Sequence, residues 1–174
     1  MLADDGNGFI YLPILNYMDG NLDFLEALQT RDDCVNSLSD GGAHCGTICD
    51  AASPTFLLQQ WVRDRKRGTI SIENAIRRQC SDTARLYGLN DRGVLAPGML
   101  ADINLIDMDA LKLGKPWLAF DLPAGGKRLL QQAEGYVCTI KSGVVTFEDG
   151  MWTGAVPGGL IRGPQRMEAL EAAE

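Results

Sequence analysis

The sequence changes character near residue 93, and this change limits the folds that the chain can adopt. Before it, two apolar, β-rich runs occupy residues 9–17 and 34–38, and apolar side chains elsewhere recur at helical spacing. After it, turn-forming residues separate short β-patterned runs. This order predicts an α/β unit followed by a smaller, mostly β unit.

Local signals set the expected elements. Capping residues and apolar spacing predict helices at residues 22–29, from Ser53-Pro54 to Gly68, from Ser71, and from a cap at Ser81. In the helix predicted from Ser53-Pro54 to Gly68, the spacing of Trp61 with Leu57 and Leu58 favours core packing over substrate contact. Strands are predicted at residues 103–106, 136–141 and 144–148, the last two joined by a turn at Ser142-Gly143.

The number of barrel-type strands is too small for a complete (β/α)8 barrel. The chain has 174 residues, of which 45% are hydrophobic, so it can bury a core. A complete barrel takes about 250 residues, and only two strands of the barrel type precede residue 93. The chain is therefore expected to form something smaller than a barrel.

The charge balance disfavours nucleic acid and anionic membranes as partners. The net charge is −7, and basic residues cluster only at residues 63–67, whereas a phosphate backbone needs a basic stripe. The uncharged residues 6–18 are shorter than the roughly 20 apolar residues of a membrane span. The opening MLADDG lacks the basic region of a signal peptide. We expect a cytoplasmic protein.

Cysteine usage fits reduced thiols better than disulfides. The five cysteines are odd in number and widely scattered. Cys45 and Cys49, with His44 and Asp50 beside them, could suggest zinc, but structural zinc sites usually combine two such pairs. The spacing is a weak indication of a metal site.

A polar segment, SDGGAH at residues 39–44, follows the predicted strand at residues 34–38. The carboxyl ends of strands are where α/β folds place their chemistry. An Asp-Gly-Gly sequence by itself is more often a plain turn. The residues alone are therefore compatible with Asp40 in a chemical role at the end of a strand and with Asp40 in a plain turn.

Longer motifs resemble a known family. NYMDGN at residues 16–21, LSDGGAH at residues 38–44 and GVLAPGMLAD at residues 93–102 together resemble the amidohydrolase superfamily. DLPAGGKRLL at residues 121–130 and VVTFEDG at residues 144–150 narrow the resemblance to the N-acyl-D-amino-acid deacylase (D-aminoacylase) branch. The resemblance extends from about residue 9 to residue 163 but covers only the carboxyl-terminal third of the family's length.

The resemblance implies an α/β plus β fold in two parts. Residues 1–92 correspond to the carboxyl-terminal end of a TIM-type (β/α) barrel, residues 93–163 to a small β-sandwich-like composite domain, and residues 164–174 to a polar tail. In the family, the motif at residues 93–102 marks the passage from barrel to sandwich. Gly93 and Gly98 permit turns there, and Pro97 fixes one of them.

The resemblance gives Asp40 the catalytic role. In the family, the aspartate after the eighth barrel strand accepts a proton from a metal-bound water and delivers it to the leaving amide nitrogen. Gly41, Gly42 and His44 are expected to bind substrate or orient this loop. For His44, the only histidine, a hydrogen bond to loop backbone is favoured over metal ligation, because the family's histidine ligands come from earlier strands.

One histidine cannot supply the family's metal centre. A catalytic zinc site normally has three protein ligands, and the family's His-x-His pair and later histidines have no counterpart here. Zinc or another divalent metal is therefore expected for the intact family and not for this chain alone. Asp40 would ligate metal only together with the missing half of the barrel.

The sequence thus predicts the carboxyl-terminal portion of a metal-dependent amidohydrolase that hydrolyses N-acyl-D-amino acids or related small amides and is inactive by itself. One alternative is a non-catalytic module that self-associates through exposed strand edges. The other is one half of a split amidohydrolase whose second chain brings the histidines. The expected partners are a small amide substrate and either a second copy of the chain or the missing barrel half. The acyl group and the metal stay open.

Overall fold

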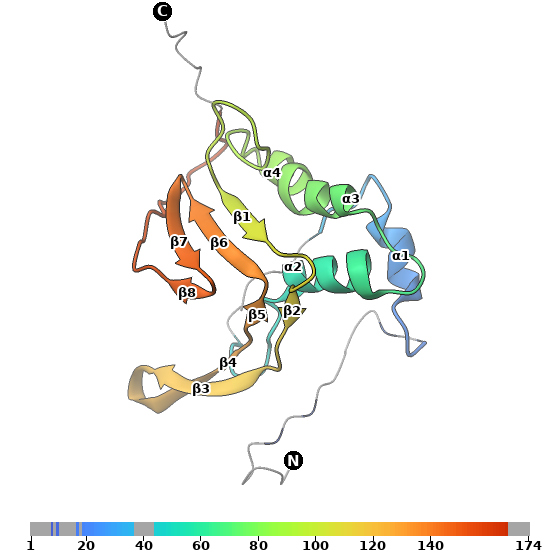
Figure 1. Cartoon of the computed structure of the whole chain (residues 1–174), viewed down its shortest axis with the longest axis vertical. Coiled ribbons are helices and arrows are strands. Elements are labelled where there is room, and N and C mark those ends of the chain that lie inside the picture. The colour runs from blue at the N-terminus through green and yellow to red at the C-terminus, as the bar shows by residue number, and fades with distance from the viewer. Residues whose placement is uncertain (1–7, 9, 11–16, 18, 37–43, 167–174) are drawn as a thin grey trace, which may run out of the picture.

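The computed structural model in Figure 1 describes residues 8, 10, 17, 19–36 and 44–166. Most of the strand predicted at residues 9–17, the segment 37–43 and residues 167–174 lie outside the described residues. Helices gather on one side of the structure and strands on the other, and the helices come first along the chain (Figure 1). The change in pattern near residue 93 therefore corresponds to a change in secondary structure.

The first helix, α1, spans Asp23–Gln29 and confirms the helix predicted at residues 22–29. None of its residues is buried. It is instead tied to the second helix by charge, because the Asp23 carboxylate binds the guanidinium groups of Arg65 and Arg67 at 2.7 and 2.8 Å. The Arg65 guanidinium also lies 4.3 Å from the centre of the Trp61 ring.

The second helix consists of α2, Ser53–Phe56, and η2, Leu57–Asp64, in which the turns widen to π-helical geometry. At its end the Arg65 amide donates to the carbonyl of Gln60, five residues earlier, at 3.1 Å. The predicted capping role of Ser53 is wrong. Its hydroxyl donates to the Asp50 carbonyl at 2.8 Å, and the residue preceding the helix is Ala52.

The third helical region runs without a break through α3, Ile72–Arg77, η3, Arg78–Asp82, and α4, Thr83–Leu86. Ser71 caps it as predicted, since its side chain accepts the Asn74 amide at 3.2 Å. The separate helix predicted to begin at Ser81 is wrong. Ser81 lies inside the continuous helix, where its hydroxyl donates to the Arg77 carbonyl at 3.2 Å. Within the described ranges, no helix has both the length and the apolar character to cross a membrane.

The main sheet has four antiparallel strands in the order β1-β6-β7-β8. The predicted strands and the hairpin turn at Ser142-Gly143 are confirmed. Both turn residues have positive φ, 52° and 78°, which matches the right-handed twist of a two-residue hairpin. The four strands are Ile103–Ile106 (β1), Tyr136–Lys141 (β6), Val144–Glu148 (β7) and Met151–Trp152 (β8).

Two small antiparallel pairs lie beside this sheet. They are Lys112–Leu113 (β2) with Ala133–Glu134 (β5), and Trp117–Leu122 (β3) with Gly126–Leu130 (β4). The second pair places the DLPAGGKRLL motif of residues 121–130 in a hairpin, for which the sequence pattern predicts no strands. A short 3-10 turn, Pro123–Gly125 (η4), reverses the chain, and an ion pair between Asp121 and Arg128 at 2.6 Å bridges the two strands.

One core joins the helical and β parts. Its buried members are Leu57, Leu58, Trp61, Ile70, Ala75 and Leu111, so the predicted packing role of Trp61 is confirmed. The hydroxyls of Thr55 and Tyr136 lie 2.7 Å apart and link α2 to β6. Gly135 permits the chain to pass close to Leu111, because a Cβ there would lie 2.6 Å from the Leu111 Cα. The described residues contain no closed barrel, and the partial barrel and the domain boundary near residue 93 stay predictions.

Candidate functional site

The candidate site is the loop predicted from the sequence at residues 39–44. Asp40, Gly41 and Gly42 lie outside the described residues, and His44 is the first described residue after them. The structure therefore defines the two segments that flank the loop. One is residues 31–36 before it, and the other is residues 44–52 after it.

The preceding segment is held from η3. Residues 34–36, the described part of the second predicted strand, form no strand. The carbonyls of Arg31 and Cys34 accept hydrogen bonds from the guanidinium of Arg78 instead, the latter at 2.9 Å. Nε of the same guanidinium donates to the Asn74 side chain at 3.3 Å.

The following segment begins with a tight turn at His44. The His44 carbonyl accepts the amides of Thr47 and Ile48 at 2.8 and 2.9 Å and the Thr47 hydroxyl at 3.2 Å. The His44 side chain is exposed, and no hydrogen bond joins its imidazole to another described residue. The backbone of His44 thus organises the turn, while the predicted side-chain roles stay predictions.

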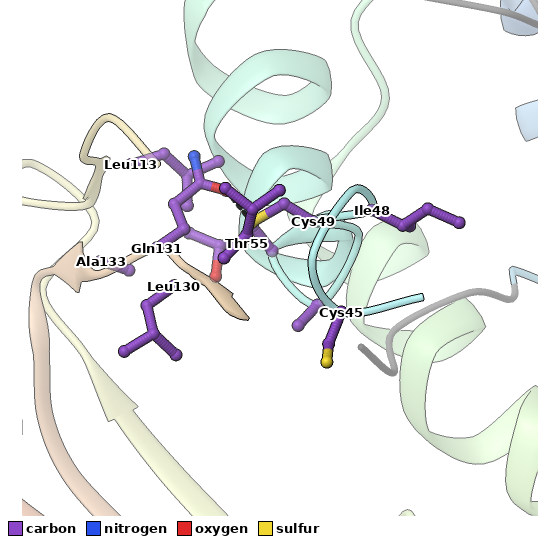
Figure 2. Close-up of a pocket in the computed structure, with 11 residues that line it drawn as sticks. Cys45, Ile48, Cys49, Thr55, Leu113, Leu130, Gln131 and Ala133 are labelled. Carbon is purple, nitrogen blue, oxygen red and sulfur yellow. Dashed lines mark hydrogen bonds between the residues drawn. The ribbon is translucent and has the colours of Figure 1, made fainter. Parts of the chain in front are cut away.

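A pocket of about 210 Å³ lies between this segment and the small strands (Figure 2). The amide of Leu129 donates to the Cys45 carbonyl at 2.7 Å, which fixes β4 against the segment. The thiol of Cys49 donates to the Gln131 side chain at 3.8 Å. Eleven residues line the pocket: Cys45, Ile48, Cys49, Ala51, Ala52, Thr55, Leu113, Leu129, Leu130, Gln131 and Ala133.

The pocket does not activate the Cys49 thiol. Burial, and then the nearby Asp50 carboxylate, raises the pKa of the Cys49 thiol above its usual range. A protonated thiol is a poor nucleophile and a poor metal ligand. The zinc site considered for His44, Cys45, Cys49 and Asp50 gains no support from this environment. Among the described residues, no three His, Cys, Asp or Glu side chains gather in a group that could hold a metal ion.

The motif at residues 93–102 packs as a structural corner. Gly93 has φ +85°, and a Cβ there would lie 2.8 Å from the Ala84 Cβ and 2.9 Å from the Cys80 carbonyl oxygen. The Asp102 carboxylate accepts the Ser142 amide at 2.8 Å and the Lys141 ammonium at 3.0 Å. The motif thus fixes the end of the third helix and the start of β1 to the hairpin turn.

Burial acts to raise the pKa of Asp102, but the Ser142 amide, the Lys141 ammonium and the Arg92 guanidinium outweigh it and hold the pKa below the ordinary value of 3.8. Asp102 is therefore ionised at neutral pH. Its partners are structural, and none of them belongs to the candidate loop.

Comparison with known families gives one match, to the model of the amidohydrolase family, over residues 19–147. The matched stretch begins just before α1, spans the candidate loop and both of its flanks, and ends within β7. The chain belongs to the amidohydrolase family. No curated protein and no solved structure matches it.

Amidohydrolases are hydrolases that typically use divalent metals. The described residues of this amidohydrolase do not by themselves fit such a metal, because they lack a group of three ligands. Sequence reasoning singled out the candidate loop, which stays a prediction, but missed Arg78, whose contacts hold the segment before it. The available signal was its helical position, since Arg78 lies three residues after Ala75 and three before Ser81, both buried.

Proposed function

We propose that this amidohydrolase hydrolyses the amide bond of N-acyl-D-amino acids and that Asp40 moves the proton in that reaction. The observation that carries the proposal is the amidohydrolase match, whose range of residues 19–147 includes the candidate loop. The motifs at residues 121–130 and 144–150, which resemble the D-aminoacylase branch, support the substrate class.

The turn at His44 supports the role of Asp40. Four residues after Asp40, the His44 carbonyl collects two amides and a hydroxyl, so the chain leaves the loop through a hydrogen-bonded turn. On the other side, Arg78 binds the carbonyls of the preceding segment. A carboxylate that transfers protons needs a fixed position relative to its substrate, and both flanks of the loop are fixed.

A further polypeptide portion is part of the proposal. The sequence contains one histidine, and the described residues hold no three-ligand group. In the proposal, this chain supplies the carboxyl-terminal portion of the enzyme, and a histidine-bearing portion, in the same polypeptide or in a separate chain, supplies the metal ligands.

The experiment measures free amine released from N-acetyl-D-amino acids and from their L enantiomers, with zinc present. The purified chain is assayed alone and together with the histidine-bearing portion. We expect no turnover by the chain alone and D-selective turnover by the combination. Asp40→Asn in the combination should lower kcat by about 10²-fold or more, the usual contribution of a proton-transferring group.

Asp32→Asn is the matched control, because its carboxylate lies near the same loop in sequence but is 93% exposed. It should leave kcat within about twofold of wild type, as surface substitutions usually do. Retained activity in Asp40→Asn would refute the role of Asp40, and turnover of the L substrates alone would refute the substrate class. Turnover by the chain alone would refute the need for further ligands.

A second candidate is a non-catalytic module that self-associates. It is favoured by exposed apolar side chains on and after the main sheet, which are Met151, Trp152, Val156 and Leu160. A mass that rises with concentration in light scattering, combined with no amide hydrolysis when the histidine-bearing portion is present, would favour this candidate over the enzyme.

A further inference from the structure

Arg78 is a charged side chain in the interior, with 1% of its surface exposed. It projects from η3 toward residues 31–36, which are more than forty positions earlier in the chain. Burying a guanidinium costs free energy unless its donors are satisfied. Here all three nitrogens donate, to the carbonyls of Arg31 and Cys34 and to the side chain of Asn74.

The geometry of these contacts requires arginine. The planar guanidinium presents its donors as a fixed fork, and the two terminal nitrogens each bind a carbonyl, three residues apart on the same segment. A lysine ammonium is a single point and cannot span both carbonyls in this way. The fork sets the position of the backbone where it leads into the candidate loop.

We propose that Arg78 is a positioning residue, whose guanidinium fixes residues 31–34, the described segment that precedes Asp40 in the sequence. The link to catalysis rests on the proposed amide hydrolysis, whereas the hold on residues 31–34 does not. The neighbouring Arg77 provides a matched control. It pairs with Asp32 of the same segment at 3.5 Å, but its side chain is 49% exposed and that of Asp32 is 93% exposed.

Limited trypsin digestion of the full chain tests the hold directly. The Arg31 side chain is 56% exposed and open to recognition, but the carbonyl that the protease must attack is bound to Arg78. Cleavage after Arg31 therefore requires the segment to detach, and its rate follows the detached population. Peptide mass spectrometry resolves this site from all others.

Arg78→Met removes the whole fork, and hydrogen bonds from a charged donor are strong enough that its loss should raise the cleavage rate after Arg31 by about 10- to 100-fold. Arg78→Lys, the milder variant, should raise it by about 10-fold, because one of the two carbonyl contacts is lost. Arg77→Lys keeps the positive charge of an exposed ion pair and should change the cleavage rate after Arg31 by less than about threefold. Cleavage after Arg128, inside β4, reports general unfolding and should stay at the wild-type rate.

An unchanged rate after Arg31 in both Arg78 variants would overturn the proposal. So would an equal increase after Arg31 and Arg128, since that result would make Arg78 a general stabiliser of the core. A selective increase after Arg31 supports it.

The hydrolysis assay tests the link to catalysis. In the active combination, Arg78→Lys should lower kcat by about 10-fold or more with KM within twofold, because a displaced catalytic group loses rate steeply. Arg77→Lys should change neither value. A normal kcat in an Arg78 variant that trypsin cleaves faster would overturn the catalytic link. If wild type shows no hydrolysis of N-acyl-D-amino acids, the proposed function fails, while the digestion still decides whether Arg78 fixes the segment.

Discussion

The hydroxyl pair of Thr55 and Tyr136 gives a direct test of how the helical and β parts are joined. The two oxygens lie 2.7 Å apart, and Thr55 is 6% exposed. Tyr136 also packs against the shared core. The test compares Tyr136→Phe, Thr55→Val and the double variant with wild type.

The expected magnitude follows from the burial of the pair. Tyr136→Phe leaves the Thr55 hydroxyl buried without this partner and should lower the free energy of unfolding by about 1–2 kcal/mol. Thr55→Val should cost about 1 kcal/mol, because Tyr136 is only half-buried and water can reach part of it. The double variant removes both hydroxyls and leaves neither unpaired. Its loss of unfolding free energy should therefore be about 1 kcal/mol smaller than the sum of the losses in the two single variants.

Urea denaturation of the four proteins measures this coupling, and thermal unfolding gives a second estimate at about 2–4 °C per kcal/mol for a chain of this length. Tyr87→Phe is the control, because Tyr87 is 73% exposed and should have no effect beyond about 0.5 kcal/mol. If the two single costs add within error in the double variant, the hydroxyls are not coupled and the proposed junction between α2 and β6 is wrong.

Two further predictions concern the β part. Gly135→Ala should destabilise the protein by about 2–4 kcal/mol, because its φ is +92° and the new Cβ would lie 2.6 Å from the Leu111 Cα. Gly143→Ala is the control and should cost about 1 kcal/mol, because its φ is +78° but no atom lies within 4 Å of the new Cβ. Equal shifts of the urea midpoint in the two variants would contradict the close approach of Gly135 to Leu111. The pKa of Asp102 is lowered on folding, so its stabilisation is present above the ordinary value of 3.8 and is lost as pH falls through the lower folded value. Between about pH 5 and pH 3, unfolding titrations should therefore show a smaller loss of stability in Asp102→Asn than in wild type, and identical losses would exclude this linkage.

Elements defined by neighbouring residues could be predicted from the sequence. The hairpin of β6 and β7 has the predicted bounds, because Ser142-Gly143 adopts the positive φ values that a two-residue turn requires. Ser71 is a second case, since a cap depends only on the amide three residues ahead. In both, the deciding contact lies within a few positions along the chain.

Elements defined by distant contacts could not be predicted in this way. Residues 34–36 have a strand-like composition, but their segment is bound by Arg78 from another part of the chain. The sequence around Pro123 and the glycines that follow it does not have the pattern of a strand, so the hairpin of β3 and β4 was not predicted. The ion pair that bridges this hairpin joins residues seven positions apart. Local composition predicts secondary structure poorly where a side chain distant in the sequence forms the hydrogen bonds of the backbone.

The candidate site also has one part that the sequence could indicate and one part that it could not. The sequence singles out the loop at residues 39–44 through its motif, but Arg77 and Arg78 are adjacent identical residues that composition cannot distinguish. Helical geometry separates them, because successive residues point about 100° apart and only Arg78 faces the buried side with Ala75. One arginine therefore forms an exposed ion pair, while its neighbour binds backbone carbonyls in the interior.

The GVLAPGMLAD motif has a structural role, which is distinct from the catalytic role proposed for Asp40. At residues 93–102, Gly93 allows close packing on Cys80, and Asp102 binds the turn between β6 and β7. A substitution there would alter the packing between the third helix and the main sheet. Because a fold can carry many reactions, the amide hydrolysis that we propose depends on Asp40 and on the residues beside its loop, and not on this motif.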